Sequence, residues 1–234
     1  MYLKVDFEPT SLFSIKKSEA TNSAGKSLFS PSPYSIKMAL LNAIITYDSL
    51  NAAKVNFNMI RDLVISFRLP KNIVVNNCFI KIMKDNDKVS PENKLLNPFK
   101  TTVAFREYVY LGENISFVIE STTNNELQLQ NYEFLKKWFM HINYFGKKGC
   151  FFQFMNSEII KDFEKSFYST LLTDSMRTGL VYQMDDMSDK NSFEDVNSYS
   201  KNKPKREKKL FVFPYKLIES NKSYSVYRNI ITPS

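Results

Sequence analysis

The chain has 234 residues, of which 43% are hydrophobic and 15% aromatic, so it can bury a core without disulfides or a structural metal. Its 32 lysines and arginines exceed its 24 acidic residues, and the resulting formal net charge of +8 favours an anionic partner, a nucleic acid first and a membrane surface second. One histidine, His141, and two separated cysteines, Cys78 and Cys150, cannot build a common zinc site. We therefore expect no metal and no cofactor, and free thiols in a reducing cytosol.

No segment reads as a membrane or export signal. Residues 1–8 contain Lys4, Asp6 and Glu8, so they lack the apolar region of a signal peptide. The longest uncharged apolar stretch, 38–47, is about half of the roughly 20 residues that a spanning helix requires. We expect a soluble, cytoplasmic protein that does not bind a membrane.

The first half of the chain predicts alternating strands and helices. Ser32 followed by Pro33 is a helix-start signal, because serine is a good N-cap and proline suits the first helical position. The expected elements are a strand over 2–7 ending before Pro9, a polar loop over 16–30, a helix over 33–47, a helix or helix–strand pair over 52–67, a strand over 72–83, a polar excursion over 84–100, and a hairpin of 101–110 with 115–120.

The second half begins with an amphipathic helix and ends with segregated charge. Apolar residues recur on one face over 124–142, and Gly146-Lys147-Lys148-Gly149 then breaks the helix. Acidic and basic runs predict a mobile loop over 184–209. Strands are expected over 150–154, 210–214 and 224–231. This order suits an α+β, ferredoxin-like core over 1–155 and a C-terminal β region over 156–234.

Three features are candidates for holding an anion. The helix over 33–47 has no acidic residue, so its N-terminal amides are uncompensated and, beside Lys26 and Lys37, could bind phosphate; the alternative is a buried core helix with a chance lysine. The turn from Gly146 to Gly149 allows close backbone approach and carries two lysines, but it also reads as an ordinary turn with solvated lysines. The basic run 201–209 is either a nucleic-acid contact or a solubilising loop.

His141 is the one imidazole available for general base chemistry at neutral pH. It falls on the flank of the helix over 124–142, and a packing role is the better interpretation because no paired Ser or Cys nucleophile is evident. A metal-free ribonuclease that uses tyrosine and lysine stays open, and the sequence does not locate such a site.

In combination, several stretches resemble the fifth numbered Cas protein family, a RAMP-superfamily subunit of type I CRISPR Cascade complexes. The resemblance rests on their order and spacing over most of the chain. The stretches are the proline-rich helix start from Gly25 to Ile44, Arg106-Glu-Tyr-Val-Tyr110, Asn143-Tyr-Phe-Gly-Lys-Lys-Gly149, and Phe211-Val-Phe-Pro214 with Tyr224-Ser-Val-Tyr227.

The resemblance implies a ferredoxin-like (RRM-like) RAMP core with a β-hairpin thumb, near 84–100, and a small C-terminal β region. It implies a subunit that binds the crRNA 5′ handle, caps the backbone filament and docks the large subunit near the protospacer-adjacent motif of the target DNA. In the type I-C branch the family member also cuts repeat RNA, so a metal-independent endoribonuclease is the alternative. This sequence departs from the expected Tyr, Lys and His cluster, and we assign no catalytic residue.

Holding an RNA end in a fixed shape requires phosphate contacts for affinity and stacked bases for identity. The phosphate contacts are expected from lysine and arginine, whereas Tyr34 and Tyr108 are candidates for stacking or for the core. The residues expected to contact RNA are Lys26, Ser27, Ser32, Tyr34, Lys37, Arg106, Tyr108, Gly146, Lys147, Lys148 and Gly149. A membrane-surface or protein-interaction module is a third reading, although the amphipathic basic helix that it would need is missing.

Overall fold

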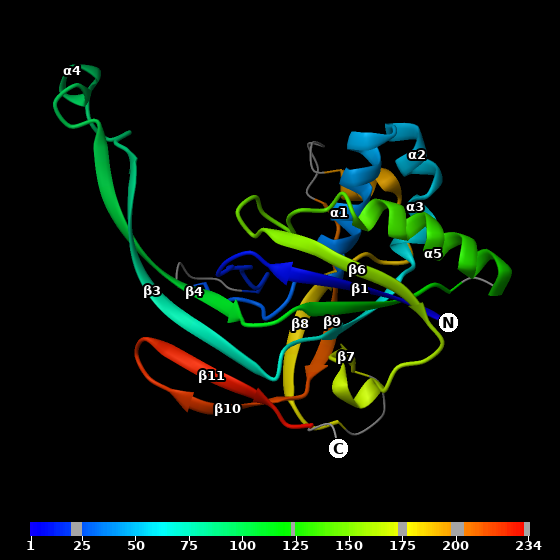
Figure 1. Cartoon of the computed structure of the whole chain (residues 1–234). Helices are drawn as coiled ribbons and strands as arrows, with labels where there is room; N and C mark the ends of the chain where they lie inside the picture. Colours follow the sequence, from blue (N-terminus) through cyan, green and yellow to red (C-terminus); the bar gives the residue numbers. More distant parts are fainter. Residues whose placement is uncertain (20–24, 123–124, 173–176, 198–203, 232–234) are drawn as a thin grey trace.

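The computed structural model of the chain contains a four-stranded antiparallel sheet with the order β2-β5-β1-β6, and helices cover one face of this sheet (Figure 1). The structure describes residues 1–19, 25–122, 125–172, 177–197 and 204–231. The core elements are β1 (Tyr2–Pro9), α1 (Pro33–Tyr47), α2 (Leu50–Val55), α3 (Phe57–Arg61), β2 (Val64–Arg68), β5 (Ile115–Glu120), α5 (Asn125–Phe139) and β6 (Phe152–Ile160). The chain order and the strand order together are those of the ferredoxin-like fold, as expected.

The local sequence explains why these elements form. In β1 the alternate residues Leu3, Val5 and Phe7 are fully buried, which is the period of a strand with one face on the core. Helix α1 has the predicted bounds, and the Ser32 hydroxyl accepts a hydrogen bond from the Ser35 amide at 3.2 Å. The segment 52–67 is a helix–strand pair, with α2 and α3 followed by β2.

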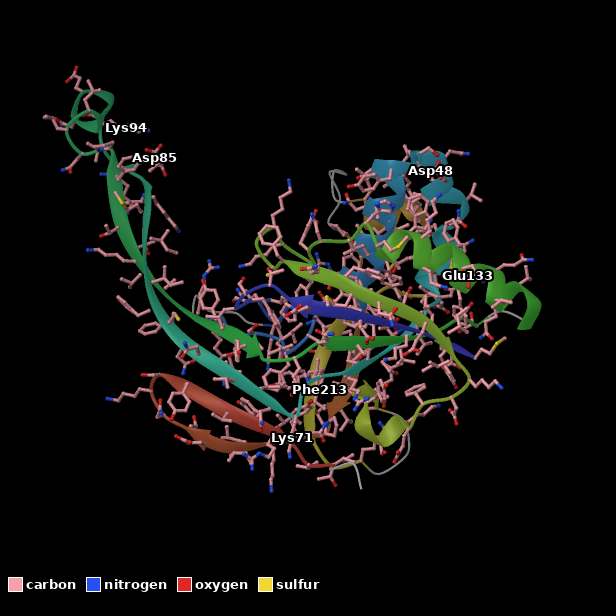
Figure 2. The ribbon with its side chains drawn as sticks, in the orientation of Figure 1. Asp48, Lys71, Asp85, Lys94, Glu133 and Phe213 are labelled. Carbon is pink, nitrogen blue, oxygen red and sulfur yellow. The ribbon has the colours of Figure 1, made fainter. Side chains whose placement is uncertain are left out.

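A long hairpin extends from this core as the thumb (Figure 1). It consists of β3 (Asn72–Asp85) and β4 (Phe99–Leu111), with the short helix α4 (Pro91–Lys94) at its tip. Figure 2 shows Asp85 and Lys94 at this tip, where they form a 2.9 Å ion pair. The polar excursion at 84–100 is therefore the distal part of a longer hairpin.

The predicted hairpin of 101–110 with 115–120 is wrong. Strand β4 pairs with β3, from Ile73 opposite Leu111 to Asp85 opposite Phe99, whereas β5 lies between β1 and β2 in the core sheet. Strand β5 is buried on both faces from Ile115 to Ile119, and such a strand is most stable in the middle of a covered sheet. The Gly112 turn suggested a local hairpin, but burial of both faces of β5 determined its partners.

The C-terminal region completes two further sheets. Strands β7 (Thr170–Leu171), β8 (Leu180–Asp186) and β9 (Glu207–Phe213) form one in the order β7-β9-β8. Strands β10 (Tyr215–Ser220) and β11 (Tyr224–Asn229) extend the base of the thumb in the order β10-β11-β3-β4. Two short 3-10 helices, η1 (Lys165–Phe167) and η2 (Phe193–Val196), connect the strands. Strand β6 continues to Ile160, past residue 155, where we expected the core to end.

The predicted mobile loop over 184–209 is wrong at both ends. Residues 184–186 and 207–209 are paired strands, with Met184 opposite Lys209. The pairing brings the acidic run against the basic one, because Asp185 bonds Arg206 and Asp186 bonds Lys209, each at 3.0 Å. Residues 198–203 of that expected loop lie outside the described residues. Among the helices that the structure describes, none is long and apolar enough to cross a membrane.

Candidate nucleic-acid interface

A groove of ≈1130 Å³ lies along α1, between the helix layer and the thumb. Its floor is the outer face of α1, where Ser35, Met38, Asn42 and Ile45 recur every three or four residues. The opposite face of α1 holds fully buried residues such as Ile36 that pack into the core. One face of the helix therefore packs into the core and the other lines the groove, which accounts for apolar residues on most sides of it.

Two walls follow the length of α1. The segment 141–147 forms one wall and runs against the helix direction, since Gly146 lies beside Ser35 while His141 stacks on Tyr47. The other wall comes from β8, η2 and Arg206. The end beside the start of α1 is closed by residues on both sides of the undescribed stretch 20–24, from Ser14 to Ser18 and at Gly25 and Leu28, and by thumb residues between Ile82 and Arg106. Figure 2 marks the opposite end with Asp48, which follows the last residue of α1.

The groove is positively charged. Among the described residues, six lysine or arginine side chains line it, against the two carboxylates Asp185 and Glu194. Those two are matched, because Asp185 pairs with Arg206 at 3.0 Å and Glu194 with Lys54 at 3.8 Å. Within the part of the chain that the structure describes, the other four form no ion pair: Lys16, Lys84, Arg106 and Lys147. Such a surface attracts a polyanion.

Five of the eleven expected RNA contacts line this groove: Ser32, Tyr34, Arg106, Gly146 and Lys147. They come from three separate segments, namely the start of α1, strand β4 and the glycine turn. The structure therefore brings together residues from three of the stretches on which the family resemblance rests.

The glycine turn has the backbone that its sequence predicts. Gly146 and Gly149 have positive φ angles of 74° and 105°, which side chains with a Cβ rarely adopt. The bridge between Tyr144 and Phe151 closes the turn, and the Cys150 amide donates to the Lys147 carbonyl at 3.2 Å. This geometry holds Lys147 on the groove wall, while Lys148 is exposed outside the groove.

Lys37 does not have the expected position. Its side chain is 1% exposed, and its Nζ donates to Asp186 Oδ1 at 2.6 Å and to the Arg61 carbonyl at 2.7 Å. Burial lowers the pKa of Lys37, although Asp186 opposes that shift. Lys37 is therefore not available for an RNA phosphate, and the alternative of a core helix with a buried lysine describes it.

Two other expected contacts at this end have structural partners. Ser27 is 1% exposed; its amide donates to Glu107 Oε2 at 2.8 Å and its hydroxyl to the Leu28 carbonyl at 3.0 Å. The Ser32 hydroxyl caps Ser35, and Pro33 has no amide proton. The first turn of α1 contains no acidic residue, as expected, but the Ser32 cap satisfies one of its free amides from within the chain.

The remaining expected residues lie around the groove. Lys26 is exposed next to it, and Tyr108 is half-buried on β4 opposite Asn76. Tyr34 is 6% exposed, and the guanidinium of Arg206 lies over its ring at 4.6 Å from the centroid. Tyr34 thereby positions Arg206 by a cation–π contact rather than offering a free stacking surface.

Lys16, Lys54 and Lys84 line the groove although no sequence motif singled them out, and Arg206 was a candidate only as part of the basic run 201–209. Arg206 was assigned to a loop, and only the pairing of β8 with β9 places it beside α1. Lys84 begins the predicted polar excursion, but in the structure it lies on a thumb strand that reaches the groove. No local pattern marks these lysines, because their role depends on contacts between segments distant in sequence.

His141 lies in the groove rather than on a helix flank. Helix α5 ends at Phe139, and His141 follows in a turn. The His141 amide donates to the Trp138 carbonyl at 3.1 Å. Its ring stacks on Tyr47, with 4.4 Å between centroids and 28° between planes, and also contacts Trp138. The packing that we expected is present, and both stacked rings also line the groove.

The chain is similar in sequence and in structure to known CRISPR proteins. No family model matches the chain. The chain is 26% identical to the CRISPR-associated protein Cas5 of Archaeoglobus fulgidus over 226 residues, which cover 94% of this chain and 92% of that protein. It also resembles the crystal structure of a CRISPR protein from Archaeoglobus fulgidus, with a TM-score of 0.51, 12% identity, and coverage of 97% of this chain and 91% of that one. The structural likeness establishes a shared fold.

Proposed function

We propose that the chain, which is similar over 94% of its length to a CRISPR-associated protein Cas5, is a member of that family and binds the guide RNA of a CRISPR effector complex in the groove beside α1. The observation that carries this proposal is the cluster of four groove cations that form no ion pair within the described residues, Lys16, Lys84, Arg106 and Lys147. Phosphate contacts supply most of the affinity of proteins for single-stranded RNA, and lysine and arginine make them.

In finer terms, the proposed RNA is the crRNA 5′ handle in a type I Cascade surveillance complex, where the chain caps the backbone filament and docks the large subunit. The thumb supports a role in assembly as well as in RNA binding. Leu95 and Leu96 at its tip are 89% and 84% exposed, and large apolar side chains this exposed are typical of protein contacts. The groove beside the thumb would hold the RNA, while the tip would contact a neighbouring subunit.

The direct test is binding of labelled repeat RNA and a scrambled control, in EDTA, over a salt series. We expect handle-selective binding that weakens steeply with salt, and weaker binding by Arg106→Ala and Lys147→Ala. Lys71→Ala is the matched control, since Lys71 is an exposed lysine below the thumb in Figure 2 and does not line the groove. Equal losses in all three variants, or no RNA binding with partner subunits present, would contradict the proposal.

A second candidate function is metal-independent cleavage of repeat RNA. One observation favours it: the only imidazole of the chain, His141, lies in the groove in contact with Tyr47. A general base must lie within hydrogen-bonding reach of its proton, and this position would allow that for an RNA in the groove. The same gel reports the answer, because site-specific cutting in EDTA that His141→Ala abolishes would make the chain a processing enzyme.

A further inference from the structure

Four rings form a row that leads from the core into the groove. Phe134 and Trp138 on α5 have centroids 5.9 Å apart, Trp138 and His141 are 6.0 Å apart, and His141 and Tyr47 are 4.4 Å apart. Exposure rises sharply along the row, since Trp138 is 1% exposed and Tyr47, at the end of α1, is 61% exposed. The row therefore anchors an open tyrosine to the interior of the protein.

The backbone around the last two rings is ordered by hydrogen bonds. The Asp48 amide donates to the Ile44 carbonyl at 2.9 Å, and Ser49 then caps α2 through the Ala52 amide at 3.1 Å. On the other side, the Ile142 amide donates to the Phe139 carbonyl at 3.1 Å. Tyr47 and His141 are thus held in place, and because His141 covers one face of the Tyr47 ring, the open surface of that ring lies on its other face.

The surroundings of Tyr47 indicate the chemistry of a ligand. Ile45 and Leu50 also line the groove and are 40% and 51% exposed, so they form an apolar patch with Tyr47. Lys54 lies one helical turn beyond Leu50 on the same groove, where it is half-exposed and pairs with Glu194 at 3.8 Å. A flat, largely apolar group fits this combination, and a nucleotide base is such a group.

We propose that Tyr47, backed by His141, is a stacking platform for one base of the RNA. This inference rests on the proposed function, and it assigns base binding to the far end of the same groove. Ser35, beside the glycine turn, and Tyr47 are separated by twelve helical residues, or about 18 Å along α1. Lys147 and Arg106 would therefore hold phosphates at one end of the groove while Tyr47 holds a base at the other.

The test compares RNA affinity for Tyr47→Phe and Tyr47→Leu. The phenylalanine variant keeps an aromatic face and should bind like the wild type, whereas the leucine variant should bind about 10-fold more weakly. The salt dependence should not change, because no phosphate contact is removed. Tyr110→Leu is the matched control, since Tyr110 is 53% exposed on β4 and does not line the groove.

A second measurement locates the base, first with the wild-type protein and then with the same two variants. 2-Aminopurine is placed at each position of the RNA in turn, and its fluorescence should be quenched by wild-type protein at one position. That quenching should persist in Tyr47→Phe and be lost in Tyr47→Leu. Thermal unfolding and the fluorescence of Trp138, the one tryptophan of the chain, confirm that each variant is folded.

Each other outcome has a distinct meaning. If wild-type protein binds RNA but Tyr47→Leu binds equally well and no position shows quenching that depends on Tyr47, the platform is wrong and the proposed function stands. If wild-type protein does not bind RNA with partner subunits present, the proposed function fails and the platform with it. If Tyr47→Phe abolishes RNA cutting while Tyr47→Leu leaves affinity unchanged, the hydroxyl acts in chemistry and the platform is overturned.

Discussion

Lys37 and Lys147 stand out as a pair because the sequence favours both as phosphate contacts and the structure places them in opposite environments. Lys37 is 1% exposed and bonded to Asp186, whereas Lys147 is exposed on the glycine turn and forms no ion pair in the described residues. Both lie close to the start of α1, so proximity to the groove did not separate them. Whether such a lysine is buried or free therefore depends on whether its side chain faces a carboxylate of another element.

The buried pair of Lys37 and Asp186 also binds one residue of the basic run 201–209. Asp186 on β8 accepts from Lys37 at 2.6 Å and from Lys209 on β9 at 3.0 Å, and Lys37 also bonds the Arg61 carbonyl at the end of α3. These bonds join the helix layer to the C-terminal sheet. Lys209 thus serves the fold, while Arg206, three residues earlier, lines the groove.

The largest expected effect comes from removing the buried cation. Lys37→Met leaves Asp186 buried with Lys209 as its remaining cation, and breaking a buried pair in this way costs about 3 to 5 kcal/mol of unfolding free energy. Urea unfolding measures it. Lys147→Met is the control and should stay within about 0.5 kcal/mol of the wild type. A loss below about 1 kcal/mol for Lys37→Met would contradict the structural role.

A second variant separates loss of the ion pair from poor packing. Lys37→Met combined with Asp186→Asn removes both charges, so it should recover part of the stability lost in Lys37→Met alone. Recovery in the same urea experiment supports an electrostatic origin. A double variant that is less stable than the sum of the two single changes would indicate a packing defect instead.

Backbone strain in the glycine turn should produce a smaller effect. Gly149 has φ of 105°, and a Cβ added there would meet no atom within 4 Å, so Gly149→Ala should cost about 1 to 2 kcal/mol through the backbone alone. Gly25→Ala is the control, because an added Cβ there meets only ordinary contacts of 3.5 Å or more. Thermal or urea unfolding compares the two, and equal stability would show that the turn relaxes.

Lys147 should affect RNA binding with little change in stability. Under the proposed function, Lys147→Ala lowers the slope of log affinity against log salt by about 1 and does so for every RNA sequence. Lys71→Ala, outside the groove, should leave the slope unchanged. A change in sequence preference with an unaltered slope would mean that Lys147 reads a base and does not neutralise a phosphate.

The smallest expected effect is a pH dependence at η2, which forms part of the groove wall. Hydrogen bonds from Lys205 and Ser192 lower the pKa of Asp195 to about 2, below its ordinary 3.8. Because the folded-state pKa is the lower one, its contribution to stability is present above the unfolded value and is lost as pH falls through about 2. The stability difference between wild type and Asp195→Asn should therefore disappear at that pH, and a difference that grows on acidification would reverse the assignment.

Local patterns predicted many elements well because the forces that form them act over a few residues. The N-cap Ser32 and Pro33 located α1 at its true bounds, and the two glycines of the turn at 146–149 have the positive φ angles that favour glycine. Strand pairing was harder. The segments 101–110 and 115–120 read as neighbours because a turn joins them, yet each belongs to a different sheet.

The sequence by itself determined most helices and strands of the core, their order, the α+β class and the excess of positive charge. It also selected five residues that line one groove. Only the tertiary structure decided which charges are buried and which are free, because an ion pair such as Lys37 with Asp186 joins residues 149 positions apart. For the same reason only the fold places Arg206, His141 and Tyr47 on one groove, since their common surface comes from packing α1 against segments far away in the chain.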